Sequence, residues 1–330
     1  PVALVAPGPG ASVSPATPLR LTFSKPVADV LGSARPKLSP ATAGHWVRPD
    51  SHTIEFRPSG FGAPLGSKLH LTLPHSVALT GIAGTRVHSG SSVEWTVPAG
   101  STLRLHQLLA DAGYLPVDWT ADGAAVARKP RDEVAAAVNP PKGSFSWRYP
   151  NVPPELKHLW TPDSANSITR GAVMMFQDRH GLAVDGVAGP QFWRALLADA
   201  IAGKRSDSGY SYVYVHRSVP QQLTLWHNGR TILRSPGNTG VPSAPTQLGT
   251  FPVFEHLRVG TMSGTNPDGS HYHDPGIKWI SYFNGGDALH SFNRASFGTP
   301  QSLGCVELPM AAAAKIWPYT PIGALVTIEN

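Results

Sequence analysis

The sequence contains a single cysteine, Cys305, among its 330 residues. A disulfide bridge within the chain is therefore excluded, and the cysteine count does not report the redox compartment. No uninterrupted apolar run reaches the roughly 18 residues that a membrane-spanning helix needs, so no such span is predicted. Charged residues are also scarce, at 15%, whereas hydrophobic residues make up 41%. This balance excludes a globally disordered chain and predicts folded domains.

Long basic runs are absent as well, although the formal net charge is +6. Residues 1–98 hold 8 Lys/Arg against 4 Asp/Glu, whereas residues 205–330 hold 8 against 7. Because no run of Lys/Arg exceeds two residues, the pattern favours a soluble basic surface, and nucleic acid is not a predicted partner. The first residue is Pro1 rather than Met, which fits a mature chain whose export signal has been removed.

The chain is too long for one hydrophobic core, so it is predicted to have several domains. Gly and Pro contribute 33 residues each without a fixed period, which is typical of short strands joined by many turns. The predicted fold class is therefore multidomain α+β and mostly β.

Residues 1–98 alternate apolar and polar positions in short runs, as at Leu19, Leu21 and Phe23, and the last run ends before Pro98. A period of two predicts strands, and the segment is interpreted as a small β-sandwich. It resembles the immunoglobulin-like modules found ahead of bacterial surface enzymes, which implies a spacer role.

Residues 101–203 change to helical spacing, with a long insertion at 116–165 that is rich in Pro and Trp. Three helices are predicted here. The first ends at Gly113, the second begins at a cap formed by Thr169, and the third has Pro190 in its first turn. The segment from Gly171 to Pro190 resembles the peptidoglycan-binding three-helix module of wall hydrolases. That resemblance implies wall contacts by Asp185 and Gly186, whereas the residues themselves fit equally well a turn that caps the next helix.

Strand patterns resume in residues 205–330, as at Tyr210 to His216 and Ala324 to Ile328, and predict a β-rich domain. This domain contains the pair on which the functional prediction rests, Cys305 and the upstream His290. A thiol is nucleophilic as the thiolate, and a nearby imidazole either takes its proton or stabilises the anion. Gly304 permits a sharp turn that directs its own amide and that of Cys305 towards a developing oxyanion.

The stretch from Ala288 to Leu308 resembles the signature of the L,D-transpeptidase family, and its actinobacterial branch is the most similar. The resemblance implies Cys305 as nucleophile, His290 as base, Ser291 as the residue that orients the base, and a backbone oxyanion hole. The residues of that hole would be Leu303, Gly304 and Cys305. Two positions differ from the family pattern, because Leu303 replaces a usual His and Glu307 stands near a usual Arg or Asn.

A second cluster of polar residues, from His271 to Asp274, could supply metal ligands. Its surroundings, rich in Gly, Asn, Pro and Asp, instead predict a loop that forms a substrate lid with Tyr272, His273 and Asp274. No metal site and no cofactor are predicted.

The predicted function is peptidoglycan cross-linking outside the cytoplasm, either secreted or associated with the cell wall. Cys305 would attack the donor tetrapeptide stem, and the acceptor amine of a second stem would resolve the thioester. Carbapenem-type β-lactams are the expected covalent inhibitors. Two alternatives remain open, an L,D-carboxypeptidase that uses water as acceptor and a wall-binding protein without catalysis. If a metal drove the reaction, chelation would abolish activity and Cys305→Ser would not. The reverse is predicted.

Overall fold

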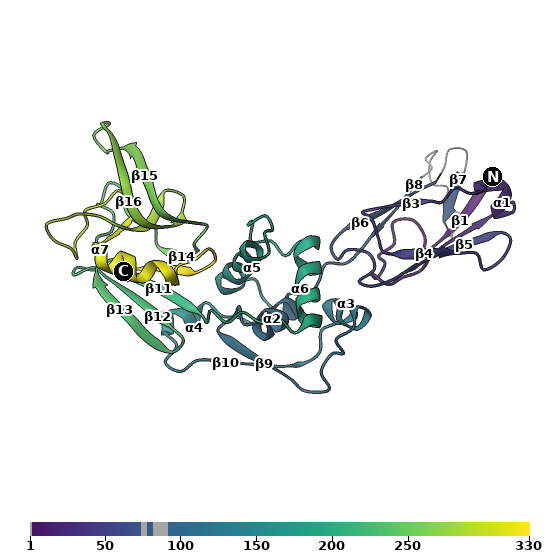
Figure 1. The fold of residues 1–330 in the computed structure, drawn as a ribbon, viewed down its shortest axis with the longest axis horizontal. Coiled ribbons are helices and arrows are strands. Elements are labelled where there is room, and N and C mark those ends of the chain that lie inside the picture. Colours follow the sequence, from purple (N-terminus) through teal and green to yellow (C-terminus); the bar gives the residue numbers. More distant parts are fainter. Residues whose placement is uncertain (1, 74–77, 82–91) are drawn as a thin grey trace. The chain divides into compact units, whose positions relative to one another are not determined.

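The computed structural model describes residues 2–73, 78–81 and 92–330 and is mostly β with seven α-helices in that part of the chain (Figure 1). Contacts divide the chain into two compact units. The first comprises Pro1–Leu108, Ala121–Lys142 and Ala188–Lys204, and the second Leu109–Thr120, Gly143–Val187 and Arg205–Asn330. This division runs through the segment predicted as a helical module, and the boundaries 1–98, 101–203 and 205–330 remain predictions. In the described part of the chain, no helix has the length and apolarity needed to cross a membrane.

Two sheets form the β part of the first unit. One has the order β4-β5-β2-β1-β7, and the other the order β3-β6-β8. The strands are β1 (Val2–Ala6), β2 (Leu19–Phe23), β3 (Lys37–Ser39), β4 (Gly44–Val47), β5 (Thr53–Pro58), β6 (Lys68–Thr72), β7 (Ala78–Gly81) and β8 (Ser92–Thr96), with a short helix α1 (Val27–Leu31).

Alternating residues of both sheets meet in one core, as Leu21 of β2, Leu71 of β6 and Trp95 of β8 do. The period-two pattern therefore folds as two sheets around a shared core. The immunoglobulin-like resemblance of this region remains a prediction.

Three helices carry the helical spacing of the middle segment. They are α2 (Thr102–Asp111), α5 (Ser167–Arg179) and α6 (Pro190–Ala202), and the insertion adds α3 (Pro130–Val138), α4 (Pro154–His158) and a hairpin of β9 (Val117–Ala121) with β10 (Gly143–Trp147). Pro190 occupies the first turn of α6, as predicted. The predicted cap of α5 was wrong, because Asn166 is the N-cap and its side chain accepts from the Thr169 amide.

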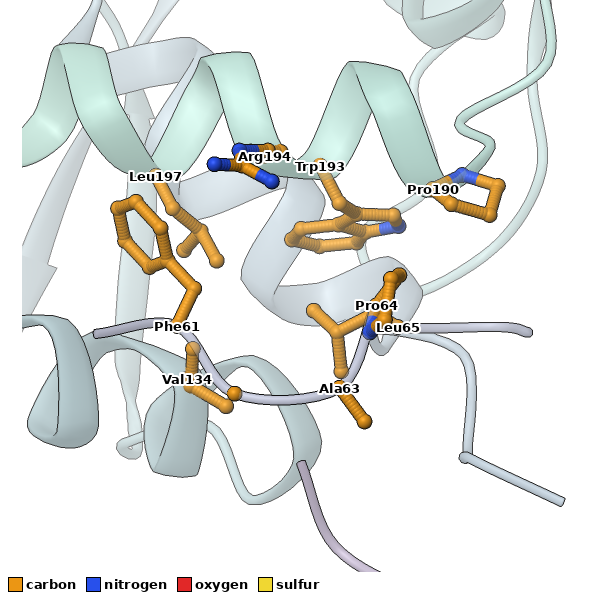
Figure 2. A pocket seen from close by; sticks show the side chains of 10 residues that line it. Phe61, Ala63, Pro64, Leu65, Val134, Pro190, Trp193, Arg194 and Leu197 are labelled. Atoms are coloured by element: carbon orange, nitrogen blue, oxygen red, sulfur yellow. The ribbon is translucent and has the colours of Figure 1, made fainter. Parts of the chain in front are cut away.

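An apolar pocket lies inside the first unit, between a loop of the β part and two helices. Figure 2 shows Trp193 and Leu197 of α6 on one side of it and Phe61 and Pro64 of the loop on the other, with Val134 of α3 beside them. None of the residues that line it is a predicted site residue, so this pocket reflects packing between loop and helices.

Besides the β9–β10 hairpin, the second unit contains two larger sheets with the orders β13-β12-β11-β19-β14 and β15-β16-β17-β18. The strands are β11 (Ser211–His216), β12 (Gln222–His227), β13 (Arg230–Pro236), β14 (Gly249–Pro252), β15 (Glu255–Thr265), β16 (His271–Asn284), β17 (Asp287–Ser291), β18 (Val306–Leu308) and β19 (Leu325–Glu329). Between β18 and β19 the chain forms the helix α7 (Met310–Ile316) and a 3-10 turn (Trp317–Tyr319).

Both sheets contribute to one hydrophobic core, which includes Val213 of β11, Val326 of β19, Leu289 of β17 and Val306 of β18. The β15–β16 hairpin projects from the rest of this unit (Figure 1). The core fixes β17 and β18, the two elements that position the predicted catalytic residues.

Candidate active site

The predicted nucleophile and base lie on neighbouring parallel strands. His290 is in β17, Cys305 directly precedes β18, and the register pairs Leu289 with Val306 and His290 with Glu307. Side chains alternate between the faces of a sheet, and Leu289 and Val306 point into the core. His290 and Glu307 therefore share the opposite face, on which Cys305 is the diagonal neighbour of His290.

The Cys305 thiol is half-buried and packs, as Tyr282 does, against a small cluster of Ile277, Ile280 and Ala288. Its Sγ donates a long hydrogen bond of 3.5 Å to the carbonyl of Gly286. Desolvation raises the pKa of the thiol to about 12, and the carboxyl of Asp287 adds to the rise, while the amide of Ala288 acts in the opposite direction. At neutral pH the resting sulfur is thus a thiol rather than a thiolate.

The imidazole of His290 is buried, with 3% of the residue exposed. Its Nδ1 lies 2.9 Å from the main-chain oxygen of Ser291, an acceptor, so Nδ1 carries the hydrogen and Nε2 is the basic nitrogen. Desolvation lowers the pKa of His290, so the ring is neutral at pH 7. Within the described residues no hydrogen bond joins His290 to Cys305. Catalytic hydrogen bonds often form only when substrate is bound.

Ser291 holds the base through its main chain, whereas its side chain has a separate role. The Ser291 hydroxyl donates to the carbonyl of Lys278 on β16 at 3.0 Å and so ties β17 to the neighbouring strand. The family resemblance implies that Ser291 orients His290, and its main-chain oxygen provides a physical basis for that role. Because every residue type has this oxygen, the role does not require a serine side chain.

A charged pair lies on the same face as the base. Arg294 donates two hydrogen bonds to the carboxylate of Glu307, at 2.8 and 2.6 Å, and its guanidinium lies 4.7 Å from the centre of the Phe292 ring. The Glu307 side chain is 5% exposed. The two charges act in opposite directions on the pKa of His290, because Glu307 raises it and Arg294 lowers it.

The turn before Cys305 is fixed by two hydrogen bonds of one side chain, that of Ser302. The Ser302 hydroxyl donates to the carbonyl of Cys305 at 2.6 Å and accepts from the amide of Gly304 at 3.3 Å. Gly304 has φ of +121°, and a Cβ at this position would clash with Oδ1 of Asp287. The predicted need for glycine here is thereby explained, and the Gly304 amide is engaged by Ser302 in this resting state.

The residues predicted as a lid lie on a strand, so their placement in a loop was wrong. Tyr272, His273 and Asp274 belong to β16 and pair with Gly264, Ser263 and Met262 of β15. Gly and Asn near the end of the hairpin favour a loop, but backbone hydrogen bonds between β15 and β16 outweigh that preference. Only residues 266–270 form the connecting turn.

Alternate residues of this strand differ in their surroundings. His273 faces Ser263, whose hydroxyl lies 2.9 Å from its Nδ1. Burial raises the pKa of Tyr272, and Cys305 contributes to that rise, while the charge of Asp274 acts on His290. Tyr272 and Asp274 are therefore the two lid candidates that interact electrostatically with the nucleophile and the base.

The two predicted wall-binding residues shape a turn in the second unit. The Gln177 side chain donates to Oδ1 of Asp185 at 2.6 Å and accepts from the amide of Gly186 at 2.9 Å. The amide of Val187 also donates to Asp185, and these bonds lower the pKa of its carboxyl. Gly186 has φ of +72°. These contacts agree with the interpretation that both residues shape a turn. Contact of these residues with the cell wall remains a prediction.

Three residues near the nucleophile were not assigned a role from the sequence. They are Arg294, which neutralises Glu307, Ser302, which fixes the turn, and Tyr282, which packs against the same small cluster as Cys305. Ser302 stands in the quoted motif, so an ST-turn signal was available there. Arg294 also stands in that motif, but its pairing with Glu307, like the packing of Tyr282, forms only in the folded chain.

Comparison with known proteins supports this picture of the domain. Residues 210–328 match the L,D-transpeptidase catalytic domain family (YkuD), and residues 163–196 match a peptidoglycan binding domain family. No curated protein matches the chain.

Several solved structures are similar. An L,D-transpeptidase from Mycobacterium smegmatis is 14% identical, with 99% of each chain covered and a TM-score of 0.34. L,D-transpeptidase 3 from Mycobacterium tuberculosis, in complex with a faropenem-derived adduct, is 14% identical, with 99% of this chain and 97% of that chain covered and a TM-score of 0.34. The catalytic domain of an E. faecium L,D-transpeptidase is 22% identical, with 37% of this chain and 99% of that chain covered and a TM-score of 0.33.

The matched residues include His290, Cys305 and the strands β11 to β19 that surround them. The chain therefore carries a YkuD-type L,D-transpeptidase catalytic domain, preceded by a peptidoglycan-binding domain, and its function is that of a peptidoglycan L,D-transpeptidase.

Proposed function

We propose that Cys305 is the nucleophile and His290 the general base of the L,D-transpeptidase reaction. The observation that supports this proposal is the parallel register of β17, which contains His290, with β18, which Cys305 directly precedes, together with the hydrogen bond between Nδ1 of His290 and the Ser291 carbonyl. The basic Nε2 is thereby left for the thiol proton. Ser291 orients the ring through its main-chain oxygen.

The donor is a tetrapeptide stem, and the thiol attacks the carbonyl that precedes its terminal D-Ala. The Sγ–C bond forms as the Sγ proton passes to Nε2 of His290, and that proton then leaves on the amine of D-Ala as the C–N bond breaks. The product is a thioester. An amine of a second stem attacks it, His290 takes the amine proton, and the regenerated thiol receives it.

Charge separation before the attack is disfavoured at this site. Burial raises the pKa of Cys305 to about 12 and lowers that of His290, so both groups are neutral in the resting enzyme. Proton transfer therefore accompanies the attack. Of the two roles open to the imidazole, acceptance of the proton is favoured over stabilisation of a preformed thiolate.

The negative charge that develops on the carbonyl oxygen needs donors, and we assign the amides of Leu303, Gly304 and Cys305 to this role. Because the Gly304 amide donates to Ser302 in the resting state, it has to exchange that partner for the oxyanion. Such a donor contributes about 3 kcal/mol of transition-state stabilisation. Tyr272 and Asp274 of the β15–β16 hairpin are the residues proposed to contact the bound stem.

The substrate also defines where the enzyme acts. Peptidoglycan lies outside the cytoplasmic membrane, so we infer an extracytoplasmic site of action. The domain at 163–196 would hold the enzyme on the wall polymer, and carbapenem-type β-lactams, which carry a strained acyl group, are proposed as covalent inhibitors of Cys305.

The nucleophile is tested by the intact mass of the protein after incubation with a carbapenem. We expect the native chain to gain the mass of one inhibitor and Cys305→Ala to gain none. Equal labelling of both proteins would refute the assignment. The acceptor is then tested by supplying tetrapeptide stem with and without a diamino-acid stem, since release of tripeptide without cross-linked product would instead identify an L,D-carboxypeptidase.

A further inference from the structure

Three side chains of metal-ligand type converge in the second unit, away from the Cys305 sheet. Glu155 lies in the first turn of α4, His216 ends β11 and Glu329 ends β19. One ligand atom from each lies within 4.8 Å of the other two, and all three residues are half-buried. β11 and β19 are parallel and pair His216 with Glu329, so these two side chains share one face of the sheet.

One oxygen of each carboxylate in this cluster lacks a hydrogen-bond donor. Oε2 of Glu155 and Oε1 of Glu329 are buried and have no hydrogen-bond partner in the described part of the chain. Nδ1 of His216 lies 3.2 Å from Oε1 of Glu329, but the two groups do not form a hydrogen bond. A buried acceptor without a donor is costly, and two of them side by side are more so because their charges repel.

The electrostatic effect is visible in Glu329. Burial raises the pKa of its carboxyl, and Glu155 adds to the rise, whereas His216 acts against it. Across the described residues, no Lys or Arg forms an ion pair with either glutamate. The cluster therefore has two acidic groups and one imidazole but, among the residues that the structure describes, no Lys or Arg to balance them.

We propose that Glu155, His216 and Glu329 form a binding site for a divalent metal ion, and that zinc is the ion it fits best. Zinc accepts imidazole nitrogen and carboxylate oxygen at about 2.0–2.2 Å, which places neighbouring ligand atoms of a tetrahedron roughly 3.3 Å apart. The separation between His216 and Glu329 is 3.2 Å. Calcium and magnesium prefer oxygen ligands alone, so the histidine selects against them.

The site would serve stability rather than the acyl transfer. His216 and Glu329 lie on the five-stranded sheet, whereas Cys305 directly precedes β18 of the other sheet. A metal ion held by all three residues would fasten α4, which belongs to the insertion at 116–165, to two strands of the catalytic domain. Binding to the folded chain alone would raise its stability in proportion to the logarithm of the metal concentration.

The test uses the full chain after removal of metal with EDTA and dialysis. Titration with ZnCl₂ should show one ion bound per chain by calorimetry, and thermal unfolding should shift to higher temperature. Loss of a residue that only hydrogen-bonds to a metal ligand lowers metal affinity by up to about 100-fold, and loss of the ligand itself should cost at least as much. Glu329→Gln and His216→Ala should therefore weaken zinc binding by about 100-fold or more. Cobalt offers a second readout, since its visible absorption reports the ligand set.

Matched controls are available close by. His158 is exposed on α4, the helix of Glu155, and Glu255 is exposed on β15. His158→Ala and Glu255→Gln should bind zinc as the native chain does. A native chain that binds no zinc saturably, or one whose affinity is unchanged in Glu329→Gln and His216→Ala, would overturn the proposal.

One further variant separates a metal site from a merely structural cluster. Glu155→Gln removes one of two repelling carboxylates, so in EDTA it should unfold at a higher temperature than the native chain, and it should lose the stabilisation by zinc. If Glu155→Gln lowered the unfolding temperature equally with and without zinc, the cluster would be structural and the proposal wrong.

Discussion

The turn at Asp185 and the site at Cys305 use their polar groups in opposite ways. In the turn, the Gln177 side chain donates to Asp185 and accepts from main-chain amides, so its hydrogen bonds are made within the chain. At the other site, Sγ of Cys305 makes one long bond to Gly286, and Nε2 of His290 has no hydrogen bond among the described residues. Groups that are fully paired support a fold, whereas groups with spare bonding capacity are available to a substrate.

The largest expected effect comes from removing the base. His290→Ala should lower kcat/KM for stem-peptide cross-linking by about 10²–10⁴-fold, because the thiol would lose its proton acceptor. His227 provides the matched control, since it is a histidine of the same domain whose Nδ1 is 3.0 Å from the Ser211 hydroxyl. His227→Ala should keep near-native activity. A His290→Ala enzyme with more than about a tenth of native activity would contradict the role of His290 as base.

The second expected effect concerns the turn that presents the thiol. Gly304→Ala should reduce acylation by a carbapenem at least about 100-fold, because the added Cβ collides with Asp287 and displaces an oxyanion donor. Gly298 also has a positive φ, of +105°, but a Cβ there meets its nearest atoms at 3.7 Å. Gly298→Ala therefore tests the effect of backbone strain alone. Equal losses in both variants would show that strain, rather than the contact with Asp287, makes Gly304 necessary.

The sequence predicted the parts of the fold that depend on local patterns. The alternation at Tyr210 to His216 corresponds to β11, and Pro190 begins α6. The predicted strand end at Ile328 agrees with β19, which ends one residue later. These elements follow from side-chain period and from backbone preferences that neighbouring residues determine.

Features that depend on distant partners were missed. Residues 271–274 were predicted as a loop because Gly and Asn crowd the adjacent turn, but pairing with β15 makes them a strand. Arg294 stands within the stretch from Ala288 to Leu308, but its pairing with Glu307 forms only in the folded chain. For the same reason no metal-ligand spacing joins Glu155, His216 and Glu329 in the sequence, since three separate segments contribute them.

The third prediction uses the charged pair beside the base. Only neutral imidazole accepts the thiol proton, so activity falls as the pH drops through the pKa of His290, which burial places below 6.5. Arg294 lowers that pKa and Glu307 raises it. Arg294→Gln should therefore move the acid limb of the kcat/KM profile to higher pH, and Glu307→Gln should move it to lower pH.

A loss of folding would not reproduce these opposite shifts. Arg294→Gln also leaves a buried carboxylate without its partner, which should cost roughly 3 kcal/mol of unfolding free energy. Denaturant unfolding measures that loss separately from the pH profile. Shifts in the same direction for both variants would mean that the pair supports the fold without tuning His290.

The smallest effect on catalysis is expected in the paired turn. Gln177→Ala removes the hydrogen bonds that hold Asp185 and Gly186, and because Gln177 is buried the unfolding free energy should fall by roughly 2 kcal/mol. Cross-linking of soluble stem peptides should stay within about twofold of native, since every partner of Gln177 is internal to the turn. Gln191→Ala, at an exposed position of α6, should change neither quantity. A Gln177→Ala chain of native stability that cross-links poorly would place this turn in the substrate site and remove the contrast between the two regions.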